Sequence, residues 1–153
     1  MRKQFNNYQG RNFNKHRTSD TISKAQRSNL MSRIKSKNTK FEADFIKQLK
    51  RIVKAKCHQN ASFIKGKPDI VFMKQRLCVF LDSDFWHGWQ FPRWKHLLKN
   101  EFWRDKILSN RKRDKRTTRY LRGRGWIVIR LWEHEIKKQK YARGILDKIN
   151  RLL

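Results

Sequence analysis

Hydrophobic and polar positions along this chain follow two periods, one typical of helices and one of short strands. The clearest helical period lies in residues 39–53, where Phe41, Phe45 and Leu49 recur at every fourth position. Residues 70–73 and 77–81 are short apolar runs, which are typical of buried strands. In chain order, the pattern predicts helices at 23–34 and 39–53, strands at 63–64, 70–73 and 77–81, a helix at 100–122, a strand at 126–132 and a helix at 141–153. This order favours the α/β class, with a central mixed β-sheet flanked by helices.

The connections between these elements carry their own signals. Residues 66–68, Gly-Lys-Pro, predict a turn, because proline cannot lie inside a central strand. Residues 74–76 join two of the strands into a hairpin, and residues 83–99 form a long loop rich in aromatic side chains. Residues 1–20 have no acid before Asp20 and predict a basic flexible arm that orders only on a partner. The remaining residues, 21–153, are expected to form one domain.

The charge balance predicts a polyanionic partner. The chain has 40 Lys and Arg against 12 Asp and Glu, a formal net charge of +28. Nucleic acid is therefore the expected partner, with DNA favoured and RNA possible, and binding should depend steeply on salt. No apolar stretch is long enough to predict a membrane span. The oligomeric state stays open.

Cysteine usage and the first residues predict an intracellular protein. Cys57 and Cys78 are too few for a disulfide or zinc framework, and Cys78 lies in an apolar run typical of a buried thiol. The first twenty residues lack the apolar segment of a secretory signal. The expected place is the cytoplasm or nucleoid, or an organelle matrix.

Asp69, Asp82 and His87 form the most informative group of residues. Asp69 opens one strand of the predicted hairpin and Asp82 ends the other, so the hairpin brings both carboxylates to one end of the sheet. Mg²⁺ prefers oxygen ligands, and a histidine can take the proton of an attacking water. The group therefore predicts a metal site that cuts a phosphodiester. The alternative is that the acids are ordinary turn and strand-end residues.

Further candidates have two readings each. Glu42 fits a capping box with Thr39, which the residues favour over a catalytic role. Asn110 and Asp114 lie on the apolar stripe of the long helix, as a buried polar network or as support for the site. Phe85 and Trp86 are either core residues or wedges that insert between bases. The other nucleic-acid-binding candidates are Arg27, Arg33, Lys112 and Arg113.

Seven segments together resemble the very-short-patch repair (mismatch) endonucleases and their relatives. They are RSNLMSRI at 27–34, TKFE at 39–42, GKPD at 66–69, FLDSDFWHG at 80–88, NRKRD at 110–114, GWIV at 125–128 and WEHE at 132–135. The resemblance implies a restriction-endonuclease-like fold and Mg²⁺-dependent cutting of DNA. It implies Asp69 as a metal ligand beside the Leu81 carbonyl, His87 as general base, and Glu42 acting through metal-bound water. Phe85 and Trp86 would match the aromatic wedge used beside a mismatch.

Two positions depart from the repair members of this family. They commonly carry His where this chain has Asp82, and Cys where it has Asp84; the Asp form is similar to a branch that includes phage and intron homing endonucleases. The cysteines of the structural zinc cluster are also absent, so no zinc is expected. The predicted function is thus a Mg²⁺-dependent DNA endonuclease of repair or homing type, with Asp69, Asp82 and Leu81 as metal ligands. The alternative is a non-enzymatic RNA-binding component of a ribonucleoprotein such as an organellar ribosome.

Overall fold

The computed structural model describes residues 26, 29, 39–98 and 100–153. The predicted arm at 1–20 lies outside these residues, as do Arg27, Arg33 and all of the predicted helix 23–34 except Gln26 and Asn29, which are helical. The elements are α2 (Lys40–Ile52), β1 (His58–Gln59), β2 (Ile70–Phe72), β3 (Leu77–Asp82), α3 (Phe91–Trp94), the short 3-10 helix η1 (Lys95–Leu97), α4 (Glu101–Gly123), β4 (Ile127–Trp132), α5 (Glu133–Lys137) and α6 (Gln139–Arg151).

The four strands form one mixed sheet in the order β1-β2-β3-β4. β2 and β3 are the antiparallel hairpin that the sequence predicts, with Ile70 opposite Val79. β4 runs parallel to β3, with Val79 opposite Ile129. A parallel pair needs a long crossover, and the segment between these strands supplies it through α4. The predicted mixed sheet flanked by helices is confirmed.

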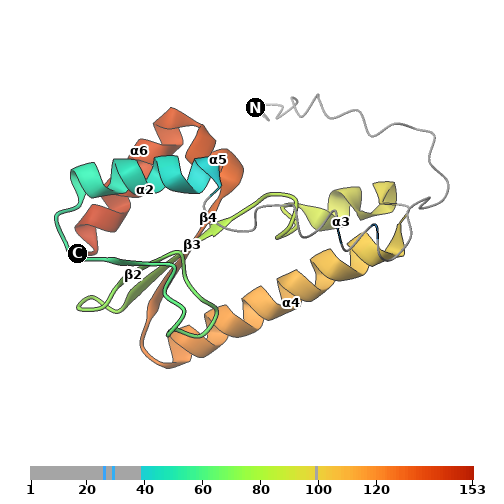
Figure 1. Cartoon of the computed structure of the whole chain (residues 1–153), viewed down its shortest axis with the longest axis horizontal. Helices are drawn as coiled ribbons and strands as arrows, with labels where there is room; N and C mark the ends of the chain where they lie inside the picture. Colours follow the sequence, from blue (N-terminus) through green and yellow to red (C-terminus); the bar gives the residue numbers. More distant parts are fainter. Residues whose placement is uncertain (1–25, 27–28, 30–38, 99) are drawn as a thin grey trace, which may run out of the picture.

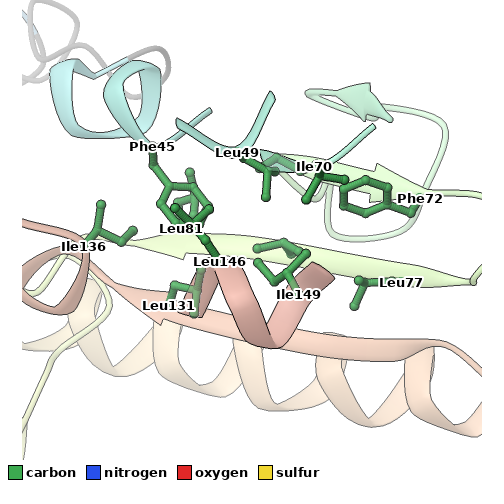
Figure 2. Packing of buried hydrophobic residues seen from close by; sticks show 12 residues of the cluster. Phe45, Leu49, Ile70, Phe72, Leu77, Leu81, Leu131, Ile136, Leu146 and Ile149 are labelled. Atoms are coloured by element: carbon green, nitrogen blue, oxygen red, sulfur yellow. The ribbon is translucent and has the colours of Figure 1, made fainter. Parts of the chain in front are cut away.

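Helices cover both faces of the sheet. In Figure 1, α2, α5 and α6 lie on one side of the strands and α4 lies on the other. Successive side chains of a strand point to opposite faces, so every residue of β2 and β3 is buried against one layer or the other. Figure 2 shows the larger cluster, between the sheet and the helices α2 and α6; its labelled members are Phe45, Leu49, Ile70, Phe72, Leu77, Leu81, Leu131, Ile136, Leu146 and Ile149.

The smaller cluster on the α4 side includes Val71, Cys78 and Leu121. Cys78 is fully buried there, and burial raises its thiol pKa to about 11. The cysteine is therefore a neutral core residue, as the apolar run around it predicts.

Three sequence predictions about elements were wrong or incomplete. The strand predicted at 63–64 is a turn with Phe63 64% exposed, and the edge strand is β1, paired through His58 with Val71. Asn60 has a left-handed φ of 49°, which interrupts the extended backbone before residue 63. The predicted aromatic loop contains the short helices α3 and η1, and α5 precedes the closing helix.

Candidate active site

The candidate site is a cleft at the end of the hairpin where β2 begins and β3 ends. Its volume is about 1260 Å³, larger than typical small-molecule pockets. The start of α2 and the middle of α4 form two of its walls. The acidic and basic groups that line it are Glu42, Asp44, Asp69, Asp82, Glu133, Asp114, His87, Lys40, Lys67, Lys106, Arg113, Arg130 and Lys137. Glu42, Asp69, Asp82 and His87, all predicted from the sequence, therefore share one cleft.

Asp69 is held by the neighbouring strand. One carboxylate oxygen, Oδ2, accepts a hydrogen bond of 2.7 Å from the backbone amide of Leu81. The pKa of Asp69 is raised to about 6: burial raises it most, the charges of Glu42 and Asp82 also raise it, and the Leu81 amide partly opposes them. Asp69 is thus a partly buried carboxylate, placed beside the Leu81 peptide and close to other acids.

Asp82 is 2% exposed and is paired with Arg130 on β4. The guanidinium donates two hydrogen bonds of 2.6 Å, one to each carboxylate oxygen. Because β3 and β4 are in parallel register, Asp82 ends its strand close to Arg130. Both oxygens accept a hydrogen bond in this pair, so Asp82 anchors Arg130; its role as a direct metal ligand stays a prediction.

His87 and Asp114 form a second pair beside the first. Nδ1 of His87 lies 2.7 Å from Oδ2 of Asp114 and 3.3 Å from Oδ1 of Asp82. Burial raises the pKa of Asp114, but the hydrogen bond with His87 and the charges of Arg130, His87 and Arg113 lower it by more, so its pKa lies below the usual value. Asp114 is therefore an ionised acceptor that orients the imidazole, the supporting role predicted as one of its two readings.

Asn110 lies one turn before Asp114 on α4 and is 8% exposed. Its side-chain amide donates a hydrogen bond of 3.0 Å to the carbonyl oxygen of Trp86. Arg111 similarly donates to the carbonyl oxygen of Gly88. Both α4 residues thus fix the backbone around His87; Asn110 also lines the cleft, and its contact with nucleic acid stays a prediction.

The turn that carries His87 is also fixed from the opposite side, by the start of α5. Nδ1 of His134 lies 2.7 Å from Oδ1 of Asp84, and the ring of Trp89 lies 4.5 Å from that of His134. Glu133 has a lowered pKa: burial raises it, but hydrogen bonds with Lys137, Ser83 and the Asp84 backbone outweigh that effect. We call the contacts among Asp84, His134 and Trp89 the clamp. It joins the turn after β3 to the end of β4.

Glu42 accepts a hydrogen bond of 3.1 Å from the backbone amide of Thr39, at the first turn of α2. This is the capping contact that the Thr39-x-x-Glu42 spacing predicts. The same residue lines the cleft, and its charge acts on Asp69. The cap therefore positions a carboxylate at the mouth of the site.

The two predicted wedge residues have different surroundings. Trp86 lines the cleft and lies against Trp103, with ring centroids 5.5 Å apart. Phe85 packs against a separate buried cluster and stacks on Trp94 at 5.9 Å. Trp86 is therefore the predicted wedge residue that reaches the cleft, and Phe85 is one of its supports.

Of the two basic candidates on α4 that the structure describes, Arg113 lines the cleft and Lys112 does not. One residue along a helix turns the side chain by about 100°, which separates their faces. Arg130 was missed by sequence reasoning, although a lone charge in the apolar run of β4 is a signal that could have identified it. His134 and Asp84 lie fifty residues apart, and no local pattern connects them.

Among the described residues, no three His, Cys, Asp or Glu side chains are grouped to hold a metal ion by themselves. Mg²⁺ does not require such a cage, because it keeps several waters and is often held by one or two carboxylates. In the same part of the chain, none of the helices has the length and apolar character needed to cross a membrane.

Comparison with known proteins gives one consistent answer. Residues 19–93 match the family model of the DNA mismatch endonuclease Vsr. The chain is 34% identical to the type II nicking enzyme V.NmeDIP of Neisseria meningitidis serogroup C, over 84% of this chain and 92% of that protein. It is 32% identical to V.HpaIIP of Haemophilus parainfluenzae, over 85% and 95% of the two chains.

The DNA mismatch endonuclease Vsr of Escherichia coli is 34% identical to this chain over 74% of its length and 73% of the relative. The matches with the Neisseria and Haemophilus proteins extend over nearly the whole relative, so they include the sheet, the cleft and α4. With its restriction-endonuclease-like fold and its His87–Asp114 pair, this chain belongs to the Vsr family of DNA endonucleases.

Proposed function

We propose that this protein is a divalent-metal-dependent endonuclease that nicks one strand of duplex DNA. The observation that carries the proposal is the shared cleft of Asp69 and the His87–Asp114 pair: one partly buried carboxylate beside a histidine oriented by a second carboxylate. Relatives named nicking enzymes support cutting of a single strand. Their names, together with the family's description as a mismatch endonuclease, favour a repair role over a homing role.

Asp69 and the Leu81 carbonyl are the groups that would hold the cation. The fit rests on the donor set: Asp69 is a carboxylate beside the Leu81 peptide, and burial together with the charges of Glu42 and Asp82 disfavours its charged form, a cost that a bound cation would offset. When bound, a divalent cation neutralises charge on the phosphate and stabilises the leaving oxygen. Zinc has no part in this proposal.

His87 supplies the base. With Nδ1 donating its proton to Asp114, the lone pair of Nε2 is free to accept a proton from an attacking water. Asp114 stays ionised because His87 and Arg130 lower its pKa, and it therefore stabilises the imidazolium that forms. Arg130 helps to hold the His87–Asp114 pair in place, because it donates hydrogen bonds to Asp82 and lies 3.3 Å from Asp114.

Trp86 supplies a ring for a distorted duplex. It lies at the cleft, its carbonyl is held by Asn110, and its ring is supported by Phe85 and Trp103. A residue whose ring packs on two other rings and whose backbone is held loses little conformational entropy when it stacks on or wedges beside a base. This arrangement suits DNA whose base stacking is already weakened.

The test is conversion of supercoiled plasmid to open circles by purified protein with Mg²⁺. His87→Ala should lower the nicking rate by about 10²–10⁴-fold, the range of a lost general base. His58→Ala is the matched control, because His58 is exposed on β1 and does not line the cleft. Wild-type rates from His87→Ala would overturn the assignment, and a linear product at the first cut would overturn single-strand nicking.

A further inference from the structure

One face of α4 continues the cleft beyond the site of cutting. Lys106, Arg113 and Tyr120 are spaced by seven residues, so they lie in a row along the helix. Lys106 and Arg113 line the cleft. Seven helical residues rise about 10 Å, which places Tyr120 about 10 Å past Arg113 toward the end of α4.

The turn before Asp69 forms the opposite border of this row. Gly66 has φ +87°, and a Cβ there would lie 2.2 Å from the side chain of Thr117, so the turn packs directly on α4. This packing brings Nζ of Lys65 to 4.0 Å from the centroid of the Tyr120 ring. The guanidinium of Arg124 lies 5.1 Å from the same centroid.

A further cation fixes the far end of the row. Arg76, in the turn between β2 and β3, lies 5.6 Å from the ring of Trp126 and donates a hydrogen bond to the carbonyl oxygen of Arg124. We call Lys65, Tyr120, Arg124 and Arg76 the cation–aromatic strip. Tyr120 is 38% exposed, so the strip is a surface feature whose parts hold one another in place.

Acids are absent from the chain segments that carry the residues of the strip. Residues 45–68, 70–81 and 115–132 contain no Asp or Glu, whereas the acids Glu42, Asp69, Asp82 and Asp114 all line the cleft. A phosphate backbone that leaves the cleft along the strip therefore meets cations without an intervening like charge.

We propose that the cation–aromatic strip binds the sugar–phosphate backbone of the duplex on one side of the cut phosphate. The inference rests on the proposed function, since it extends the same DNA from the cleft. From Arg113 to Arg124 the helix and its cap rise about 16 Å, which corresponds to about five nucleotide steps of 3.4 Å. The strip thus gives the enzyme a longer contact on one flank of its cut site than on the other.

The test compares Lys65→Ala/Arg124→Ala with the control Lys148→Ala/Arg151→Ala, which removes two exposed cations from α6, on the other side of the sheet. Each protein is titrated with a duplex that has ten base pairs on both sides of the cut site, and with duplexes cut back to two base pairs on one side or the other. Dissociation constants, their salt dependence and single-turnover nicking rates are measured.

The strip variant should bind the long duplex about tenfold more weakly than wild type, and its log–log salt slope should be smaller by about 2. The loss should disappear on the duplex that lacks one particular flank, and the nicking rate at saturation should not change. Equal affinities for the strip variant and the control, or a loss that persists whichever flank is removed, would overturn the proposal. Affinity for the long duplex is read without cutting, so an inactive wild type would contradict the proposed function, whereas equal affinities of the strip variant and the control for that duplex would overturn the strip.

Discussion

At the scale of single residues, the fold holds Asp69 in surroundings that disfavour its charged form. Its pKa of about 6 in the fold lies above the ordinary value of 3.8, so the fold favours the protonated form. Stability from this group is present below the ordinary pKa and is lost as pH rises through about 6. The charged carboxylate therefore destabilises the metal-free protein at neutral pH.

Asp69→Asn should stabilise the metal-free protein at pH 7.5, because asparagine can still accept the hydrogen bond from the Leu81 amide without carrying a charge. The expected gain is on the order of 1 kcal/mol, discounted for the partial exposure of the group. Urea unfolding at pH 4 and pH 7.5 checks this: the gap between variant and wild type should appear only at the higher pH. A gap of the same size at both pH values would contradict the shifted pKa.

At the scale of elements, the turn from Ser83 to Trp89 depends on contacts made by other elements. It carries Trp86 and His87, and α4 holds it through Asn110, while the clamp holds it from α5. Asp84→Ala or His134→Ala should lower the single-turnover nicking rate by about tenfold through mispositioning of His87. The nicking rate of the double variant should fall no further than that of either single variant, because each substitution removes the same contact between Asp84 and His134.

A double-mutant cycle of wild type, the two single variants and the double variant measures this coupling. It is read both in the nicking rate and in the free energy of unfolding. Asp84→Asn, which keeps an acceptor for His134, is the conservative control and should retain most of the rate. Additive losses in the double variant would show that Asp84 and His134 act separately and that the clamp is not a unit.

Elements with a strong local period could be predicted from the sequence, and those set by distant contacts could not. Helix α2 and the β2–β3 hairpin have repeating apolar positions of their own, and the hairpin alone was enough to place Asp69 near Asp82. The partner of Asp82 is Arg130, forty-eight residues away, and it is brought there by the parallel register of β3 and β4. Hydrophobic periods do not give the order of strands in a sheet, so the pairing of Asp82 with Arg130 could not be predicted from them.

At the scale of the whole molecule, the distribution of charge sets how the protein binds. A chain of net charge +28 should bind duplex DNA mainly through phosphate contacts. Between about 50 and 200 mM salt, affinity for duplex DNA should fall by about 10³-fold or more, whereas the nicking rate of the saturated complex should change little. Equilibrium titrations and single-turnover reactions across this range check the prediction, and an affinity independent of salt would contradict it.

The central claim is that Asp69 serves catalysis and not DNA binding, and one measurement tests it most directly. Single-turnover nicking and the dissociation constant are measured with the same duplex for wild type and Asp69→Asn across a Mg²⁺ titration. The nicking rate of Asp69→Asn should fall by about 10³-fold or more, with affinity unchanged or tighter because a charge that repels phosphate is gone. If Asp69→Asn nicked the duplex at the wild-type rate at any Mg²⁺ concentration, that result would contradict the account.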